Sequence, residues 1–262
     1  MASQTFEWHP GKLLRDDQDS STTNFALLVL NQPLKNGTNL RRLWKNSVIR
    51  VAADGGANRL HELSSFHGKF SNLQAIIGDL DSLSPSVRNF YTSRPNPAEV
   101  IHDADQDSTD FGKAITWIRK GRKGIDIVAL GGIGGRVDQG LSQLHHLYLF
   151  HPGPDYAAGH LYLLSGSSLT FLLTAGTHHI QVKEDGEDEV FGRHVGIIPL
   201  QEPSVISTKG LEWDVTDWES KIGGQMSTSN RVLPQTKCVE VQTSKDVLFT
   251  IALRPIDGED DA

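Results

Sequence analysis

The sequence predicts an α/β domain with a doubly wound, mostly parallel sheet, followed by an all-β domain that forms an antiparallel sandwich. Two observations predict this division. Between residues 25 and 150, short apolar runs alternate with segments of helical periodicity, which is typical of a parallel sheet covered by helices. Beyond His151-Pro152-Gly153-Pro154, strand-like runs follow one another with turn residues between them and almost no helical periodicity.

Apolar runs in the first half are expected to be buried parallel strands. They are residues 26–30, 48–52, 73–77, 125–130 and a weaker run at 100–101. Such runs lack polar alternation because helices cover both faces of a parallel sheet. Residues 54–58 open one intervening helix, and Ser84-Pro85 begins another, because serine caps helices and proline suits the first helical position. Apolar side chains recur at helical spacing in residues 109–119 and 137–148.

The second half contains further runs that we expect to be antiparallel strands. They are residues 161–164, 169–173, 179–182, 195–200, 237–241 and 247–253. Glycine, proline and polar turns separate these runs, as in a β-sandwich. We therefore expect a flexible N-terminal segment at residues 1–24, an α/β domain at residues 25–155 and a β-sandwich at residues 156–262.

The composition narrows the class of protein. The 262-residue chain carries a formal net charge of −7, which argues against a nucleic-acid partner and against binding to an anionic membrane. No run reaches the roughly 18 apolar residues that a membrane helix needs, and residues 1–24 lack the apolar middle of a signal peptide. The single cysteine excludes an internal disulfide and suits a reducing compartment, so a cytoplasmic protein is expected.

Acidic residues gather where predicted strands end. The clusters are Gly78-Asp79-Leu80-Asp81-Ser82, Asp105-Gln106-Asp107-Ser108-Thr109-Asp110 and Gly134-Gly135-Arg136-Val137-Asp138-Gln139. In an open parallel sheet the carboxyl ends of the strands face one crevice, which is where ligands bind. Carboxylates gathered there repel one another unless a cation compensates them, and oxygen ligands suit Mg²⁺ beside substrate phosphates. The sequence therefore predicts a metal-assisted enzyme that acts on a phosphate-bearing substrate.

Two of these acidic clusters also have plain structural interpretations. On an extended backbone Asp79 and Asp81 point the same way and can share one cation, although surface loops often carry such a pair. The acidic residues at 105–110 complement the dipole of the helix that follows, with Asp107 or Thr109 as its cap. A role in binding is favoured because the acids exceed what a helix dipole requires and Gln106 and Thr109 add neutral hydrogen-bonding groups.

Two glycine-containing segments are candidates for nucleotide contacts. Residues 54–58 let a phosphate or ribose approach the backbone at a helix start, or they form a plain turn capped by Asp54. Residues 131–136 lack the lysine and hydroxyl of a phosphate-binding loop, but they bring Arg136 and Asp138 to the same sheet edge. The planar fork of arginine can bridge phosphate oxygens, although a simply exposed arginine is the alternative.

In the second half, the segments 207–213 and 227–230 stand out. Trp213 can stack on a flat, cationic ligand, although a core tryptophan is the common alternative.

Together, these segments resemble the thiamine pyrophosphokinase family, and the motifs run in order from about Leu27 to Leu253. The matching pieces are residues 53–59, 78–82, 105–111, 131–132 with 135–139, Thr208 with 210–213, and 227–230. The resemblance implies an α/β domain followed by a β-sandwich. It also implies transfer of a pyrophosphoryl group from ATP to the hydroxyethyl oxygen of thiamine, with release of AMP.

The resemblance also implies roles for individual residues and a partner for the chain. The Mg²⁺ ligands are Asp79, Asp81 and Asp110. The catalytic set adds Asp107 and Arg136 to these three. The ATP contacts are Asp54, Gly55, Asn58, Asp79, Thr109, Arg136 and Asp138. The thiamine contacts are Gln106, Asp107, Ser207, Thr208, Trp213, Ser229 and Asn230. The family is generally homodimeric, so the resemblance implies a homodimer in which each site is shared between one subunit's first domain and the other subunit's second domain.

Some features depart from the family pattern or fall outside it. Leu80 and Val137 stand where phenylalanine is common, and both are expected to pack rather than react. The resemblance does not explain residues 1–24 or 184–189.

Two other functions are weighed against this one. A metal-dependent nucleotide-sugar transferase with an Asp-x-Asp motif accounts for Asp79 and Asp81 but not for Trp213. A non-catalytic nucleotide sensor would bind ATP without turnover.

Overall fold

The computed structural model describes residues 4–15, 24–34, 37–67, 70–151, 153, 155–183 and 190–255. Residues 184–189, which the family motifs leave unexplained, lie outside the described residues. The described chain separates into two compact units, one of residues 24–166 and one that joins residues 4–15 to residues 167–255. No helix of the described residues is long and apolar enough to cross a membrane.

The first unit is a six-stranded parallel sheet in the order β7-β6-β2-β3-β4-β5. Its strands are β2 (Phe25–Val29), β3 (Ile49–Ala53), β4 (Ala75–Gly78), β5 (Glu99–His102), β6 (Asp126–Leu130) and β7 (Leu161–Leu164). All residues of β2, β4 and β7 are buried, as expected for strands covered on both faces. This confirms the predicted parallel α/β architecture.

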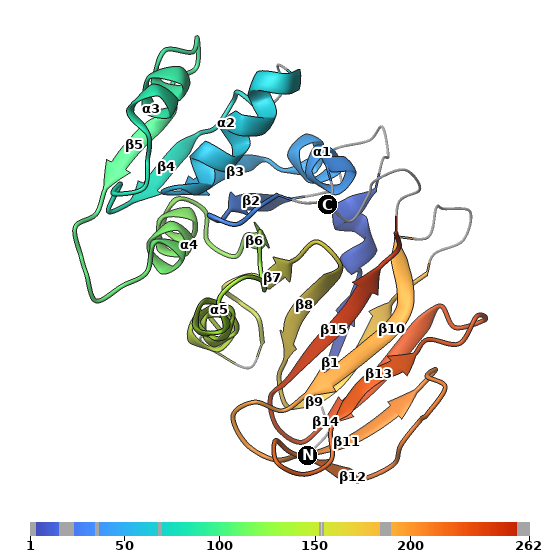
Figure 1. Ribbon diagram of the computed structural model, residues 1–262. Coiled ribbons are helices and arrows are strands. Elements are labelled where there is room, and N and C mark those ends of the chain that lie inside the picture. The colour runs from blue at the N-terminus through green and yellow to red at the C-terminus, as the bar shows by residue number, and fades with distance from the viewer. Residues whose placement is uncertain are drawn as a thin grey trace. The chain divides into compact units, whose positions relative to one another are not determined.

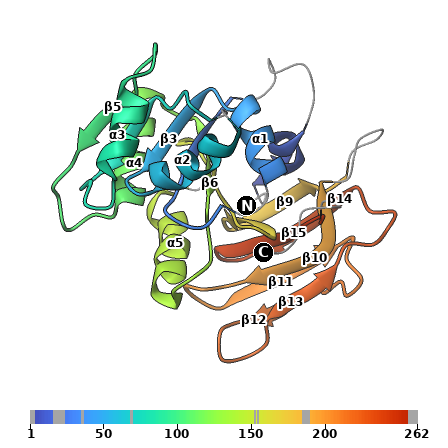
Figure 2. The same ribbon diagram turned by 45° about the horizontal axis from the view of Figure 1, so that its top comes forward.

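Helices cover both faces of this sheet. They are α1 (Gly37–Asn46), α2 (Gly56–His67), α3 (Pro85–Thr92), α4 (Asp110–Gly121) and α5 (Val137–Leu149). Figures 1 and 2 show α1, α2 and α3 on one face, with α4 and α5 on the other. Helix α3 begins at Pro85, as predicted, although the Ser84 side chain makes no capping hydrogen bond. Helix α4 is capped by Thr109, whose hydroxyl accepts from the Gly112 amide.

The run at residues 161–164 corrects one prediction. It was expected in the antiparallel half, but it forms β7 and pairs in parallel with β6, from Ile127 opposite Leu161 to Leu130 opposite Leu164. A short, fully buried run has no alternation that would reveal its partner, and the turn-rich stretch before it suggested a domain boundary. Along the chain, the first compact unit therefore ends at residue 166 and the second continues from residue 167, rather than at the predicted 155 and 156.

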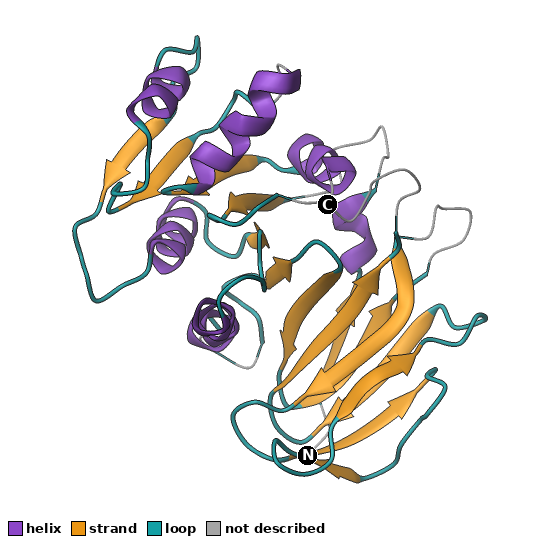
Figure 3. Cartoon of the chain, viewed as in Figure 1, coloured by secondary structure: helices purple, strands orange, loops and turns teal. Residues whose placement is uncertain are grey.

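The second unit is built from strands that form two sheets. One sheet has the order β1-β9-β14-β11-β12, and β13, β10, β15 and β8 are neighbours in the other. The strands are β1 (Thr5–Trp8), β8 (Ser168–Leu173), β9 (Gly176–Gln181), β10 (Phe191–Ile198), β11 (Ser204–Lys209), β12 (Trp218–Ser220), β13 (Ser227–Arg231), β14 (Cys238–Thr243) and β15 (Val247–Leu253). Among the described residues, the strand pairs of this unit are antiparallel except β1 with β9. Apart from the 3₁₀ turn η1 (Pro10–Leu14), the helices of the described chain lie in the α/β unit (Figure 3).

Residues 4–15 differ from the flexible segment expected there. Strand β1 pairs with β9, and Trp8 is 2% exposed. The Trp8 ring stacks on Phe171 of β8 with centroids 4.6 Å apart, so these two rings join the two sheets. Phe171 in turn contacts Phe249 of β15. A chain segment without an apolar run is therefore held by one large aromatic side chain and by backbone pairing.

Candidate active site

Three aspartates from separate segments converge at one edge of the parallel sheet. Asp54 follows β3, Asp79 follows β4, and Asp110 is the first residue of α4. One carboxylate oxygen from each lies within 4.8 Å of the others. This agrees with the rule that ligand sites of open α/β sheets form beyond the carboxyl ends of the strands.

Hydrogen bonds orient two of the three carboxylates. Asp110 Oδ1 accepts from the Asp79 amide at 3.1 Å, and Asp54 Oδ2 accepts from the Ser82 amide at 3.0 Å. The other oxygen of Asp54, Oδ1, is buried and has no hydrogen-bond partner among the described residues. Because a buried oxygen without a partner is costly, this atom is suited to contact a ligand such as a cation.

The surroundings of Asp110 disfavour its charge. Burial raises the pKa of Asp110, and the negative charges of Asp79 and Asp54 add to the rise. The hydrogen bond from the Asp79 amide and the charge of Lys113 oppose it. The Lys113 ammonium is almost fully buried, 3.5 Å from Asp110 Oδ1, and it also donates to the Asp103 carbonyl oxygen. A cation at the cluster would relieve the repulsion that Lys113 compensates only in part.

Gly78 allows this convergence. A Cβ atom at this position would lie 2.8 Å from Cγ of Asp110 and 2.9 Å from Cβ of Asp54, which is closer than such atoms approach. Its φ of +157° is also uncommon for a residue with a side chain. The residue before Asp79 therefore has to be glycine for the three carboxylates to meet.

The loop after β4 differs from the extended conformation that was expected. Leu80 has a φ of +64°, and Asp79 Oδ1 accepts from the Asp81 amide at 3.1 Å, so the chain turns there. Asp81 is exposed and does not belong to the group formed by Asp54, Asp79 and Asp110. The premise of an extended backbone from Asp79 to Asp81 is wrong, because the left-handed Leu80 between them removes the two-residue alternation of a strand. A metal-binding role for Asp81 remains a prediction.

The carboxylates lie in the wall of a cleft of about 560 Å³ within the α/β unit. Predicted site residues among its lining are Asp54, Gly55, Asp79, Thr109, Asp110 and Arg136. Predicted residues of this unit that do not line it are Asn58, Asp81, Gln106, Asp107 and Asp138. Asn58 instead holds the neighbouring loop, because its amide donates to the Ser82 carbonyl and its oxygen accepts from the Ser84 amide.

The segment before α4 is organised by its own side chains. Asp103 Oδ1 accepts from the Asp105 amide, and Asp105 Oδ1 accepts from the Asp107 amide at 2.9 Å. The Ser108 hydroxyl donates to Asp105 Oδ2 and lowers the pKa of that carboxyl. Gln106 and Asp107 are exposed at the outside of these turns.

Arg136 and Asp138 pair with each other at the start of α5. Arg136 Nε and Nη2 donate to the two carboxylate oxygens of Asp138, at 3.1 and 2.5 Å. Their side chains are 76% and 59% exposed, so the pair is solvated and contributes little to stability. The two-pronged geometry is the one by which arginine also binds phosphate.

Sequence reasoning missed an amide-rich part of the cleft. Asn31 and Gln32 follow β2 after one intervening residue, Leu30, and Gln139, Ser142 and Gln143 lie on α5. The strand-end rule applied to Asp79 would also have found Asn31 and Gln32. Gln139 belongs to the motif at residues 135–139 but was given no role in the site, and Ser142 and Gln143 carried no signal beyond their polarity on a helix.

In the β unit, most of the predicted thiamine contacts support one loop. Asn230 Oδ1 accepts from the Trp213 amide at 3.2 Å, and Asn230 Nδ2 donates to the Trp213 carbonyl oxygen at 2.9 Å. Asp214 accepts from the Thr208 hydroxyl and from the Gly210 amide. The Trp213 side chain, which was weighed as a core residue, is 55% exposed. The chain therefore fixes the backbone of this loop and leaves the indole accessible.

Two predicted contacts flank this loop. The Ser207 hydroxyl accepts from the Asp217 amide at 2.9 Å, and Ser229 has a φ of +60° beside Asn230. The Arg231 guanidinium lies 5.6 Å from the Trp213 ring centroid.

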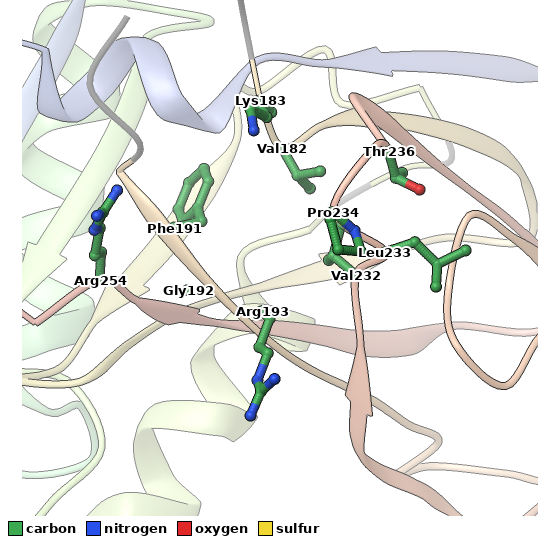
Figure 4. Close-up of a pocket in the computed structure, with 10 residues that line it drawn as sticks. All are labelled: Val182, Lys183, Phe191, Gly192, Arg193, Val232, Leu233, Pro234, Thr236 and Arg254. Atoms are coloured by element: carbon green, nitrogen blue, oxygen red, sulfur yellow. The ribbon is translucent and has the colours of Figure 1, made fainter.

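The β unit has a separate cavity of about 270 Å³. Figure 4 shows its lining, with Phe191 and Arg254 on one side and Leu233 and Thr236 on the other. None of the predicted thiamine contacts lines it, so it is distinct from the Trp213 loop.

The donor set of the carboxylate cluster fits a hard divalent cation. All three groups offer oxygen only, and Asp54 Oδ1 is buried without a partner among the described residues. Mg²⁺ takes such ligands, usually one or two carboxylates with water and substrate phosphates completing its shell.

Comparison with known proteins identifies the family. A model of the thiamin pyrophosphokinase catalytic domain matches residues 40–155, and one of its vitamin B1 binding domain matches residues 177–248. Thiamine pyrophosphokinase 1 of Arabidopsis thaliana is 36% identical, with 92% of this chain and 91% of the relative covered.

Solved structures agree with these matches. The crystal structure of yeast thiamin pyrophosphokinase has a TM-score of 0.81 and 26% identity, covering 97% of this chain and 92% of the other. Thiamin pyrophosphokinase from Candida albicans has a TM-score of 0.77 and 26% identity, with 96% and 93% covered. Neither the nucleotide-sugar transferase nor the sensor gains support from any of these matches. The resemblance seen in the motifs is therefore confirmed, and the chain belongs to the thiamine pyrophosphokinase family, enzymes that make thiamine diphosphate.

Proposed function

We propose that the cleft of the α/β unit binds ATP, with Mg²⁺ held by Asp54, Asp79 and Asp110. The observation that carries this proposal is the convergence of three carboxylates, one of which, Asp54, has a buried Oδ1 without a hydrogen-bond partner among the described residues. When bound, the cation supplies charge neutralisation for the polyphosphate. The resemblance adds Asp81 as a ligand, from the same loop as Asp79.

The reaction is pyrophosphoryl transfer, in which the hydroxyethyl oxygen of thiamine forms a bond to the β-phosphorus of ATP and AMP leaves. The guanidinium of Arg136 is suited to the phosphates, because it can exchange the Asp138 carboxylate for phosphate oxygens in the same two-pronged geometry. Lys113 keeps Asp110 in place beside the Asp79 amide. Positioning and charge stabilisation are expected to supply most of the acceleration.

The β unit supplies the thiamine contacts in this proposal. Trp213 offers an exposed indole to a cationic aromatic ring, and Asn230 holds its backbone. Ser207, Thr208 and Ser229 complete this surface, and Gln106 and Asp107 approach thiamine from the segment before α4. The name of the domain model that matches residues 177–248 supports this assignment.

We also propose a homodimer in which one subunit's cleft works with the other subunit's Trp213 loop. The support comes from the resemblance and from α5, where the apolar side chains of Val137 and Leu141 are 78% and 57% exposed. Two impaired variants, Asp110→Asn and Trp213→Ala, are mixed under subunit exchange and assayed at a thiamine concentration well below the wild-type KM, where both are nearly inactive. Activity should rise to about a quarter of the wild-type value, because half of the dimers then carry one intact site of two. No recovery upon mixing would contradict shared sites. The single cysteine further supports a cytosolic location.

The central experiment is a product assay. Purified protein is incubated with ATP, Mg²⁺ and thiamine, and thiamine diphosphate and AMP are quantified. Equal amounts of the two products are expected, and chelation of the metal should stop the reaction. Formation of ADP and thiamine monophosphate instead would refute pyrophosphoryl transfer.

A further inference from the structure

His146 contacts Thr109 and Phe111, which line the cleft, but His146 is not itself a lining residue. It lies on α5 with 4% of its surface exposed. Its ring stacks against Phe111 of α4 with centroids 4.8 Å apart, and against Phe150 at 5.8 Å. Packing on both rings fixes the orientation of the imidazole, so the direction of each ring nitrogen is set.

The hydrogen bonds of His146 determine its tautomer. Nδ1 lies 2.5 Å from the Ser142 carbonyl oxygen, which can only accept, so Nδ1 carries the proton. Burial lowers the pKa of His146, the bond to Ser142 opposes this shift, and the neighbouring His145 adds to it. The ring is therefore neutral near pH 7 and Nε2 has a free lone pair. Nε2 lies 2.7 Å from Thr109 Oγ1, so the Thr109 hydroxyl donates to His146.

This bond uses the only proton of the Thr109 hydroxyl. A hydroxyl has one proton to donate and two lone pairs to accept with. The proton goes to His146, and one lone pair accepts from the Gly112 amide at 3.1 Å. One lone pair remains for a ligand, and Thr109 lines the cleft. The hydroxyl can therefore accept a hydrogen bond from a ligand but cannot donate one.

We propose that His146 is a positioning residue that makes Thr109 a hydrogen-bond acceptor in the cleft, so that Thr109 contacts a hydroxyl or a metal-bound water rather than a bare phosphate oxygen. This inference rests on the proposed function of the cleft. It refines the assignment of Thr109 to ATP binding, because an unprotonated phosphate oxygen needs a donor and this hydroxyl has none to offer.

The first test reads the tautomer without any substrate. Long-range ¹H–¹⁵N NMR of the protein near neutral pH should show His146 protonated on Nδ1 and unprotonated on Nε2. A signal from the tautomer protonated on Nε2 would overturn the proposal, because His146 would then donate to Thr109 and free the hydroxyl proton.

The second test is a double-mutant cycle on kcat/KM. His146→Leu keeps apolar volume between the two phenylalanines but cannot accept from Thr109, and kcat/KM should fall on the order of tenfold, the worth of one neutral hydrogen bond. His146→Gln, which can accept from Thr109, should restore most of the activity. In a Thr109→Val background, His146→Leu should cause no further loss.

Controls separate this role from simple packing and from failure of the proposed function. His145→Gln changes the exposed neighbour on the same helix and should leave kcat/KM unchanged. An equal loss from His146→Leu with and without the Thr109 hydroxyl would refute the positioning role. A wild-type protein that makes no thiamine diphosphate would instead refute the proposed function. The NMR measurement would then still show which nitrogen of His146 carries the proton.

Discussion

The buried imidazole of His178 predicts a loss of stability in acid that can be assigned to one residue. His178 has no exposed surface, Trp8 Nε1 donates to its Nδ1 at 3.0 Å, and its Nε2 donates to the Thr174 carbonyl oxygen at 2.8 Å. Burial lowers the pKa of His178 from 6.5 to about 4, although the bond to Thr174 opposes the shift and His179 adds to it. The neutral form of His178 therefore accepts the hydrogen bond from Trp8 that links β1 to β9.

The sign and size of the effect follow from linkage. Above a pH of about 6.5 neither the folded nor the unfolded chain binds the His178 proton, so the full stability is present. As the pH falls toward 4, the unfolded chain binds this proton and the folded chain does not, so the free energy of unfolding decreases. A pKa difference of about 2.5 units at about 1.4 kcal/mol each removes about 3.5 kcal/mol once the pH has fallen below 4.

Urea unfolding across this pH range tests the assignment. His178→Gln keeps a donor for Thr174 and an acceptor for Trp8 but does not titrate, so its free energy of unfolding should depend less on pH, by up to about 1.4 kcal/mol per pH unit. The control is His179→Gln, which changes the partly exposed neighbour on the same strand. This variant should keep most of the decrease in the free energy of unfolding that His178 causes between pH 6.5 and 4. Parallel curves for wild type and His178→Gln would refute the reasoning.

Three further predictions concern the site. Gly78→Ala should reduce turnover on the order of tenfold or more, because the new Cβ separates Asp110 from Asp54, and AMP release that matches the wild type would contradict this. Asp110→Asn should lower AMP release roughly a hundredfold with an unchanged circular dichroism spectrum, whereas Asp105→Asn, exposed on the adjacent turns, should stay within a factor of about two. Trp213→Ala should raise the KM for thiamine roughly tenfold and leave the KM for ATP near its original value, and an unchanged thiamine KM would remove the indole from the site.

Local sequence patterns were sufficient to predict much of the fold and of the site in the α/β unit. The strand-end rule predicted that Asp79 and Asp110 lie at one edge, and Thr109, which caps α4, was one of the two residues predicted for that role. Both depend on short-range signals, namely apolar runs and capping residues. Asp54 was placed nearby but not among the carboxylates that converge, because its φ of +38° and its bond to the Ser82 amide arise only when two loops meet.

Elements that depend on distant partners were missed. Strand β1 has four residues and pairs with His178 and its neighbours, which follow it in the chain only after the whole α/β unit, so nothing within residues 1–24 marks it. Helix α1 is mostly polar and buries Leu40, Leu43 and Trp44, too few apolar residues to stand out in the sequence. The left-handed backbone of Leu80, which ends the extended conformation expected from Asp79 to Asp81, likewise has no signature in a triplet of residue types.

The pairing of β1 with β9 has a consequence for how the polypeptide is made. The ribosome releases Thr5–Trp8 first, yet their partners on β9 emerge only after the whole α/β unit has been synthesised. The β unit is thus discontinuous in the chain, with the α/β unit inserted into it. A fragment that starts after residue 166 would leave β9 with an open edge and the aromatic ring of Phe171 uncovered, so expressing the C-terminal part alone invites self-association.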